Sequence, residues 1–400
     1  MPEADSEQPA GDARAPIGAP PPDRAPQRLA FLVWDGLIGG AELFTVALAA
    51  ELRSRGVEST VIFVGHADQL EDRLRRDGTP FRSLGLRPGS RVLTHPRRLA
   101  AAVAETGATA AILDSVGYLG PALRLAGFRG HIVGVEHGAL IPANQQSLRR
   151  RAPRLPGRIL GLPAYDAEVA VSAYMERLAR DRPHHRRLVR LPHGVRLPAG
   201  VEPPRPHPGP LRLGFVGRLV PGKGVDVLLR ALARLGAGYP GLAPVLAIAG
   251  DGPARPALER LARRLGLDDE HVAFLGWTSD ITRFWATRDL AVAANDDVVE
   301  SFCLAVAEAL AAARPAIVSD RGALPELVVD EVTGVTVCPG DVDGLARALE
   351  RYRDAPDRLT AHGAAARRFA EENLGLGRCA DRYLDLLAAL PPRPPRSRLR

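Results

Sequence analysis

The stretch LRLGFVGRLVPGKGVDVLLRAL at residues 211–232 decides the fold class of this 400-residue chain. A short apolar run comes first, a glycine-rich turn follows, and an amphipathic pattern with helical spacing completes the unit. This order predicts a buried strand, a tight loop and a helix, the building block of a parallel α/β sheet. The loop contains Lys223, the only lysine among the 53 basic residues, and its glycines suggest that it serves a phosphate.

The same alternation of short apolar runs and amphipathic segments extends in both directions from this unit. Further strands are expected at residues 29–34, 59–64, 108–114, 131–135, 167–172, 243–250, 271–276, 289–294, 314–319 and 334–337. Helices are expected between them, for example at residues 40–56, 67–78 and 301–313. Strand–helix alternation favours parallel sheets with right-handed crossovers. We therefore expect an α/β protein of two doubly wound, Rossmann-like domains that face a central cleft.

Six prolines within residues 198–210 mark a linker between the two domains, because no helix or central strand tolerates that density. An N-terminal domain is then expected at residues 28–197 and a C-terminal domain at residues 211–374. Gly375 and Gly377 interrupt the helical pattern ahead of RCADRYLDLLAAL, and we expect residues 375–390 to form a final helix that packs back across the domains.

The two ends of the chain, residues 1–27 and 391–400, are rich in proline and lack periodicity, so we expect disordered tails. The three cysteines, Cys303, Cys338 and Cys379, form no CxxC pair, which favours a reducing compartment. No apolar run reaches the roughly 18 residues of a membrane span, and no signal sequence is evident. A cytoplasmic protein is expected.

The charge of the chain is basic overall and unevenly distributed, with a net charge of +7 and twelve arginines against four acidic residues within residues 149–196. Such a segment is suited to an anionic membrane surface or an anionic acceptor, although a solvated arginine-rich face is the plainer interpretation. Aromatic residues make up 5% of the chain and do not alternate with the arginines, so nucleic acid is not expected as a partner.

The glycine-rich turns of this chain match neither of two known kinds of phosphate-binding loop. A nucleoside triphosphatase P-loop needs Ser or Thr after the lysine to hold Mg²⁺, and this chain has Gly224 there. A dinucleotide fold needs G-x-G-x-x-G after its first strand, and WDGLIGGAE at residues 34–42 lacks that spacing. What remains is a helix N-terminus flanked by Arg218 and Lys223, which suits a diphosphate without a metal. A glycine turn with two solvated cations is the structural alternative.

Two pairs of acidic residues follow in the second half. Glu300 and Glu308 would lie about 12 Å apart if the segment were helical throughout, which exceeds the roughly 5–9.5 Å of a glycosidase pair. Such carboxylates could instead bind hydroxyls at opposite ends of an elongated ligand, or simply favour the helix dipole and face solvent. Asp341 and Asp343 form a D-x-D sequence, but PGDVDGLARALE predicts a helix N-cap rather than a metal site.

Several short motifs occur in a fixed order along the chain. They are GGAE (residues 39–42), EHG (136–138), VAVS (169–172), LPHGV (191–195), GRLVPGKG (217–224), AGDGP (249–253), FLGW (274–277), Glu300 with Glu308, and GALPELV (322–328). The set, over residues 28–385, resembles the retaining GT-B glycosyltransferases of glycosyltransferase family 4, glycosyl transferases group 1. Each motif is weak alone, but the ordered set is specific.

The resemblance implies a role for each matching residue. Arg218 and Lys223 would neutralise the donor diphosphate, Glu300 would face the transferred sugar, and His137 would lie close to that sugar. Glu308 would bind the nucleotide ribose. The donor site would also include Phe302, Cys303, Leu304, Gly217 and Gly250, and the loop of Gly39 and Gly40 would close on the phosphates and admit the acceptor. No metal or other cofactor is expected.

Three positions depart from the family pattern. Cys303 and Ala313 stand where the family usually has glycine, and His193 stands in place of the asparagine of NG[VI]. A side chain at position 303 could narrow the space around the sugar, which leaves the donor sugar open.

The resemblance implies a retaining transferase that moves a hexose-type sugar from a nucleotide-diphosphate donor to an acceptor hydroxyl. The acceptor would be a sugar, a lipid-linked molecule or a small molecule, in the synthesis of a cell-surface polysaccharide, glycolipid or related glycoconjugate. Peripheral contact with the inner face of an anionic membrane would fit the basic segment. A GT-B sugar-nucleotide epimerase and a non-catalytic nucleotide-sugar-binding protein remain as alternatives.

Overall fold

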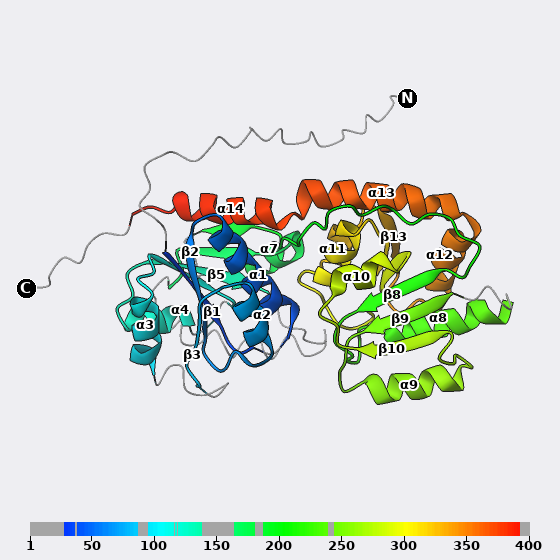
Figure 1. Ribbon diagram of the computed structural model, residues 1–400, viewed down its shortest axis with the longest axis horizontal. Helices are drawn as coiled ribbons and strands as arrows, with labels where there is room; N and C mark the ends of the chain where they lie inside the picture. Colours follow the sequence, from blue (N-terminus) through cyan, green and yellow to red (C-terminus); the bar gives the residue numbers. More distant parts are fainter. Residues whose placement is uncertain are drawn as a thin grey trace, which may run out of the picture.

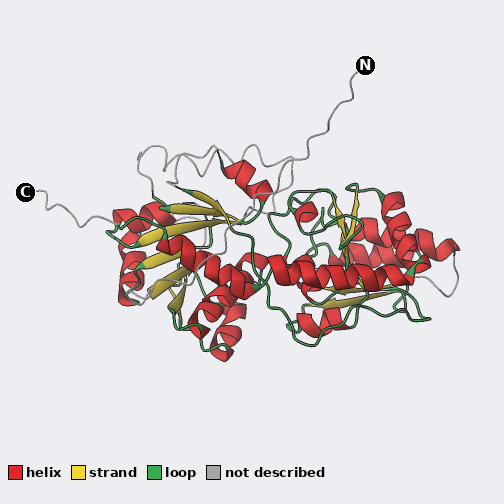
Figure 2. Ribbon diagram, turned by 90° about the horizontal axis from the view of Figure 1, so that it is seen from above, coloured by secondary structure: helices red, strands yellow, loops and turns green. Residues whose placement is uncertain are grey.

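The computed structural model describes residues 28–36, 38–86, 95–115, 117, 119–137, 164–180, 187–238 and 244–392. These residues form two α/β halves, each with helices on both faces of one parallel sheet (Figure 1, Figure 2). The N-terminal tail, most of the C-terminal tail and much of the basic segment at residues 149–196 lie outside the described residues.

Among the described residues, the N-terminal half has a seven-stranded sheet in the order β3-β2-β1-β4-β5-β6-β7. The strands are β1 (Arg28–Val33), β2 (Glu58–Phe63), β3 (Phe81–Ser83), β4 (Ala110–Leu113), β5 (His131–Glu136), β6 (Ala167–Ala170) and β7 (Leu188–Arg190). The helices that accompany them are α1 (Gly40–Ser54), η1 (Asp68–Leu70), α2 (Glu71–Arg76), α3 (Pro96–Glu105), α4 (Leu119–Leu125) and α7 (Ala173–Ala179).

The C-terminal half repeats this plan with a six-stranded sheet in the order β10-β9-β8-β11-β12-β13, again counted over the described residues. Its strands are β8 (Arg212–Val216), β9 (Val245–Ala249), β10 (Val272–Gly276), β11 (Leu290–Ala293), β12 (Ala316–Ser319) and β13 (Gly334–Val337). Its helices are α8 (Val225–Gly238), α9 (Arg255–Arg264), α10 (Ile281–Ala286), α11 (Leu304–Ala311), η4 (Leu324–Glu326), α12 (Val342–Asp354) and α13 (Pro356–Asn373).

Both sheets pair their strands in parallel and reverse their order at one point, between β1 and β4 and between β8 and β11. Loops at the carboxyl ends of strands that flank such a reversal are the usual place for a ligand in open α/β sheets. The predicted fold class is confirmed, and each strand expected from the sequence is present. The edge strands β3 and β7 were not expected, because each has only three residues.

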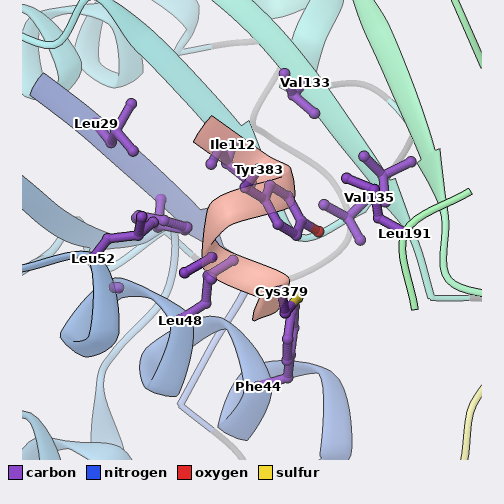
Figure 3. Packing of buried hydrophobic residues seen from close by; sticks show 14 of the residues in the cluster. Leu29, Phe44, Leu48, Leu52, Ile112, Val133, Val135, Leu191, Cys379 and Tyr383 are labelled. Atoms are coloured by element: carbon purple, nitrogen blue, oxygen red, sulfur yellow. The ribbon is translucent and has the colours of Figure 1, made fainter. Parts of the chain in front are cut away.

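The final helix, α14 (Leu376–Ala388), belongs to the core of the N-terminal half although it follows the C-terminal half in the chain. Figure 1 shows α13 along one half and α14 along the other. Tyr383 and Cys379 of α14 lie among Phe44 and Leu48 of α1 and the side chains of the sheet (Figure 3). Burial of this apolar face ties the two halves together, at roughly 25 cal/mol per Å² of apolar surface removed from water.

The proline-rich segment at residues 198–210 contains no helix or strand and runs along the C-terminal half. Three of its backbone carbonyls accept hydrogen bonds from side chains there: Pro198 from Arg367 at 2.9 Å, Glu202 from Arg314 at 2.8 Å, and Pro204 from Thr360 at 2.7 Å. These bonds hold the connection in place between the last strand of one sheet and the first strand of the other.

Candidate active site

The loop that follows β8 is fixed by contacts with the loop that follows β11. Gly224 has a φ of +69°, and a Cβ there would lie 1.7 Å from the carbonyl oxygen of Ala294. The carbonyl of Gly222 accepts a hydrogen bond from the amide of Val298 at 3.0 Å. The backbone conformation and this close approach both require glycine at position 224. They give a steric reason why this position lacks the Ser or Thr of a P-loop.

The side chain of Lys223, on the loop after β8, forms an ion pair with Glu300, on the loop after β11. Both side chains are largely buried, with exposed fractions of 12% and 9%. Glu300 also accepts a hydrogen bond from Nδ2 of Asn295 at 3.3 Å. Burial by itself lowers the pKa of Lys223, but the Glu300 carboxylate overcomes this effect and raises the pKa above its ordinary value. The lysine is therefore a fixed positive charge at neutral pH.

Arg218 is exposed at the start of the same loop, close to the N-terminal half. Its guanidinium lies 3.9 Å from where a Cβ on Gly39 would be, so the two loops meet across the interface. Gly40 approaches Leu304 at the start of α11, where a Cβ would lie 3.5 Å from Leu304 Cδ1. Among the residues that the structure describes, none forms an ion pair with Arg218.

Glu308 lies one turn into α11 and is half-buried. Burial raises its pKa to about 7, although Arg73 of α2, on the opposite half, acts to lower it. Over the described ranges, its carboxylate accepts no hydrogen bond and forms no ion pair. A carboxylate desolvated without a partner is costly, so this group is available to accept hydrogen bonds from ligand hydroxyls. The motifs did not indicate Arg73.

The residues at the start of α11 contact both halves of the molecule. Phe302 and Leu304 pack against the core of the N-terminal half as well as that of the C-terminal half. Cys303 is the N-cap residue of α11, and its side chain is buried. Burial raises the pKa of its thiol to about 12, so the thiol stays protonated. The first turn of α11 presents amides and the positive end of the helix dipole at this junction.

His137 follows β5 and connects several polar groups of the N-terminal half. Its Nε2 lies 2.5 Å from Oδ1 of Asp114, which follows β4 and accepts a hydrogen bond from the hydroxyl of Thr45 at 3.0 Å. Its Nδ1 lies 3.1 Å from Nε2 of His193. The motifs indicated His137, whereas Asp114 and the contact with His193 emerge only from the folded chain. The position of Asp114 at the end of a predicted strand was the available signal.

Gly217 and Gly250 lie at the carboxyl ends of β8 and β9, where the backbones of the two strands make close contact. A Cβ on Gly250 would lie 1.9 Å from the carbonyl oxygen of Gly217, so the two backbones touch at the carboxyl ends of β8 and β9. The amide of Gly250 donates to the carbonyl of Gly276 at 2.7 Å. These glycines bring the loops after three neighbouring strands close together.

A further contact joins the two halves beside this site. Glu326, in η4, accepts hydrogen bonds from the amides of Ala173 and Tyr174 at 2.7 and 2.6 Å. These amides are at the N-terminus of α7, where a negative charge is favourable. No motif or spacing indicated this contact, because the partners lie about 150 residues apart.

The D-x-D sequence serves as a helix cap. Oδ1 of Asp341 accepts a hydrogen bond from the amide of Gly344 at 2.8 Å, as the N-cap of α12, and Asp343 pairs with Arg234. The capping prediction is confirmed. Within the described ranges, no group of three or more His, Cys, Asp or Glu side chains could hold a metal ion.

Two Rossmann-like domains whose strand ends meet at loops of this kind define the GT-B class of fold, and solved structures support this assignment. Anabaena HepE in complex with UDP and glucose has 21% sequence identity and a TM-score of 0.75, covering 91% of this chain and 100% of that chain. A glycosyltransferase from Rickettsia africae has 18% identity and a TM-score of 0.73, covering 91% and 98%. At such identities the likeness concerns the fold.

Family models match both halves of the chain. The model described as glycosyl transferases group 1 matches residues 210–354, and that described as Glycosyltransferase Family 4 matches residues 38–197. A GDP-mannose-dependent alpha-(1-6)-phosphatidylinositol monomannoside mannosyltransferase from Mycolicibacterium smegmatis is 32% identical over 280 residues, or 64% of this chain and 69% of that protein. The chain belongs to the group 1, family 4 glycosyltransferases.

Other relatives are matched over a smaller share of their length. A D-inositol 3-phosphate glycosyltransferase from Saccharomonospora viridis is 34% identical over 233 residues, or 56% of this chain and 50% of that protein. The chain spans 22% of an exopolysaccharide phosphotransferase from Streptomyces coelicolor, to which it is 33% identical over 214 residues, 52% of this chain. Within the described part of the chain, no helix is long and apolar enough to cross a membrane.

Proposed function

We propose that this protein is a retaining glycosyltransferase that moves a hexose-type sugar from a nucleotide-diphosphate donor to an acceptor hydroxyl without a metal ion. The observation that carries the proposal is the arrangement of Arg218, Lys223, Glu300 and Glu308 around the start of α11, where the two halves meet. Two cations suit a diphosphate, and a carboxylate on either side suits the hydroxyls of a sugar and of a ribose.

The chemical task in such a transfer is to stabilise the charge that develops on the departing diphosphate. Lys223, held between two loops, and Arg218 supply fixed positive charge, and the first amides of α11 add hydrogen-bond donors. Because these groups are already in place, they need little reorganisation as the bond breaks. Glu300 orients Lys223 and faces the transferred sugar. The acceptor gives its proton to an oxygen of the leaving phosphate, so the protein supplies no nucleophile.

Glu308 would bind the ribose of the donor. Its half-buried carboxylate has no hydrogen-bond or ion-pair partner among the described residues, and hydroxyl donors would satisfy it. The neighbouring Arg73 comes from the opposite half, so donor binding at this point involves both domains. We infer that the donor is bound when the halves are in contact.

The relatives support a lipid-linked or anionic acceptor. The names of two of them specify phosphatidylinositol monomannoside and D-inositol 3-phosphate. Both of these molecules contain an inositol and a phosphate. An anionic acceptor of this kind suits the excess of arginine at residues 149–196. We therefore place the reaction in the synthesis of a glycolipid, cell-surface polysaccharide or related glycoconjugate, with peripheral contact at an anionic membrane.

The donor is tested first by binding. Thermal unfolding of the full chain is measured with UDP-, GDP-, ADP- and dTDP-sugars, since a ligand that binds the folded state raises the unfolding temperature. We expect one nucleotide class to stabilise the wild type, and Glu308→Ala to remove most of this stabilisation. No stabilisation by any donor would contradict the proposal.

Turnover is tested next with the donor so identified and a panel of inositol-containing and sugar acceptors. We expect Lys223→Ala and Arg218→Ala to reduce turnover by roughly 10²-fold or more. Arg230→Ala is the matched control, because Arg230 is an exposed cation on the helix that follows the same loop. Wild-type rates in both site variants would overturn the assignment. Activity is expected to survive EDTA, and release of free nucleoside diphosphate should require acceptor, which separates a transferase from an epimerase.

A further inference from the structure

We propose that His193 is a positioning residue of this site, which holds His137 through a hydrogen bond between the two imidazole rings. The proposal rests on the proposed function and on the family resemblance, which implies that His137 lies close to the transferred sugar. It concerns a residue at which this chain departs from the motif of its family, since histidine stands where asparagine is usual.

The ring of His193 is held in a fixed plane by contacts from both halves. It is 3% exposed. It stacks on Phe44 of α1, with ring centroids 3.8 Å apart, and meets Phe302 edge-on at 5.2 Å. A ring confined in this way cannot turn to another partner, so its Nε2 stays directed at Nδ1 of His137, 3.1 Å away.

Each of the two ring nitrogens of His137 has its own partner. Asp114 is an acceptor toward the hydroxyl of Thr45, and its Oδ1 lies 2.5 Å from Nε2 of His137, so the two side chains form an ion pair when His137 is protonated. Nδ1 is left to interact with His193. Both nitrogens of His137 are therefore engaged, and its ring is held from two sides, as in other sites where a second group orients a catalytic histidine.

The charges around the pair determine where its proton resides. Burial alone lowers the pKa of His137, but Asp114 after β4, Glu42 from α1 and Glu136 from β5 raise it above the ordinary value. Burial and the charge of His137 hold the pKa of His193 well below that value. Of the two rings, His137 is therefore the one that more readily takes a proton, and when it does, its Nδ1–H donates to the neutral Nε2 of His193. The acceptor on His193 stabilises the charged form of His137.

Two substitutions separate this hydrogen bond from the packing of the ring. His193→Phe keeps an aromatic ring between Phe44 and Phe302 but removes the acceptor. His193→Asn shortens the side chain and restores the residue usual in the family, with an amide that can pair with Nδ1 of His137. If the hydrogen bond is the cause, the asparagine variant resembles the wild type and the phenylalanine variant does not.

The primary measurement is the ¹⁵N signal of the histidine rings, followed by NMR over pH 5 to 9 in the donor-free full chain. A hydrogen bond to a charged group contributes enough to shift a pKa by roughly one to two units. We expect the pKa of His137 to fall by about that amount in His193→Phe and to stay near the wild-type value in His193→Asn. Circular dichroism verifies that each variant is folded.

Activity supplies the second measurement. We expect kcat of His193→Phe to fall roughly tenfold with little change in KM for the donor. Its pH profile should lose activity at a lower pH than the wild type, because charged His137 is lost as pH rises through its pKa. An unchanged His137 titration in His193→Phe, or an equal fall in His193→Asn, would overturn the proposal. Because the NMR titration needs no turnover, failure of the proposed function would be seen separately.

Discussion

Replacing Gly224 with alanine adds only one methyl group, but it is expected to destabilise the C-terminal half strongly. The backbone of Gly224 has a φ of +69°, which costs a residue with a Cβ about 1–2 kcal/mol. The new Cβ would lie 1.7 Å from the carbonyl oxygen of Ala294. Backbone must move to relieve this overlap, and overpacking of this kind costs about 1–3 kcal/mol or more. The expected total is about 2–5 kcal/mol.

The matched control is Gly266→Ala in the same half. Gly266 has a φ of +73° and no atom within 4 Å of its would-be Cβ, so it carries the conformational cost without the overlap. Thermal unfolding followed by tryptophan fluorescence compares the two, since the buried Trp285 reports on this half. At about 2–4 °C per kcal/mol, Gly224→Ala should unfold several degrees below Gly266→Ala. Equal shifts would refute the view that the loop is held against Ala294.

Two further predictions concern the interface between the halves. Glu308 keeps a proton up to about pH 7 in the folded chain but loses it near pH 4.5 when unfolded, so its contribution to stability falls as pH rises through that window. Glu308→Gln should therefore gain in unfolding temperature over the wild type between pH 5 and pH 8, and a constant difference would contradict this. Glu326→Gln weakens the charge-assisted bonds to the amides of Ala173 and Tyr174, at a cost of about 1–3 kcal/mol. Small-angle scattering should show a larger radius of gyration, and an unchanged radius would mean that this contact does not hold the halves together.

The fold class was predictable because its signals are local. Apolar runs long enough to be buried on both faces mark every central strand, whereas β3 and β7 are too short to show a pattern. The family resemblance also marks Ala313 as a departure, since the family usually has glycine at this position, and the structure gives Ala313 a φ of +58°, a conformation that favours glycine.

The site was predictable only where motifs place a residue at the end of a strand. The motifs put Lys223 and Glu300 on loops after two neighbouring strands, and the structure brings the two side chains together. The approach of Arg73 to Glu308 and the stacking of His193 on Phe44 depend on how the two halves and their helices pack. No periodicity or spacing encodes such contacts, because they join segments separated by many other elements.

The lone lysine has a physical explanation in this arrangement. Lys223 lies between Gly222 and Gly224, whose missing side chains allow the loop to touch the backbone of residues 294–298. An ammonium group is compact and meets Glu300 in the small space that remains, whereas a planar guanidinium needs room for two parallel bonds. Arg218 stands at the open edge of the same loop, where no such limit applies. The chain thus uses lysine at the confined position and arginine at the exposed one, and each cation suits the space around it.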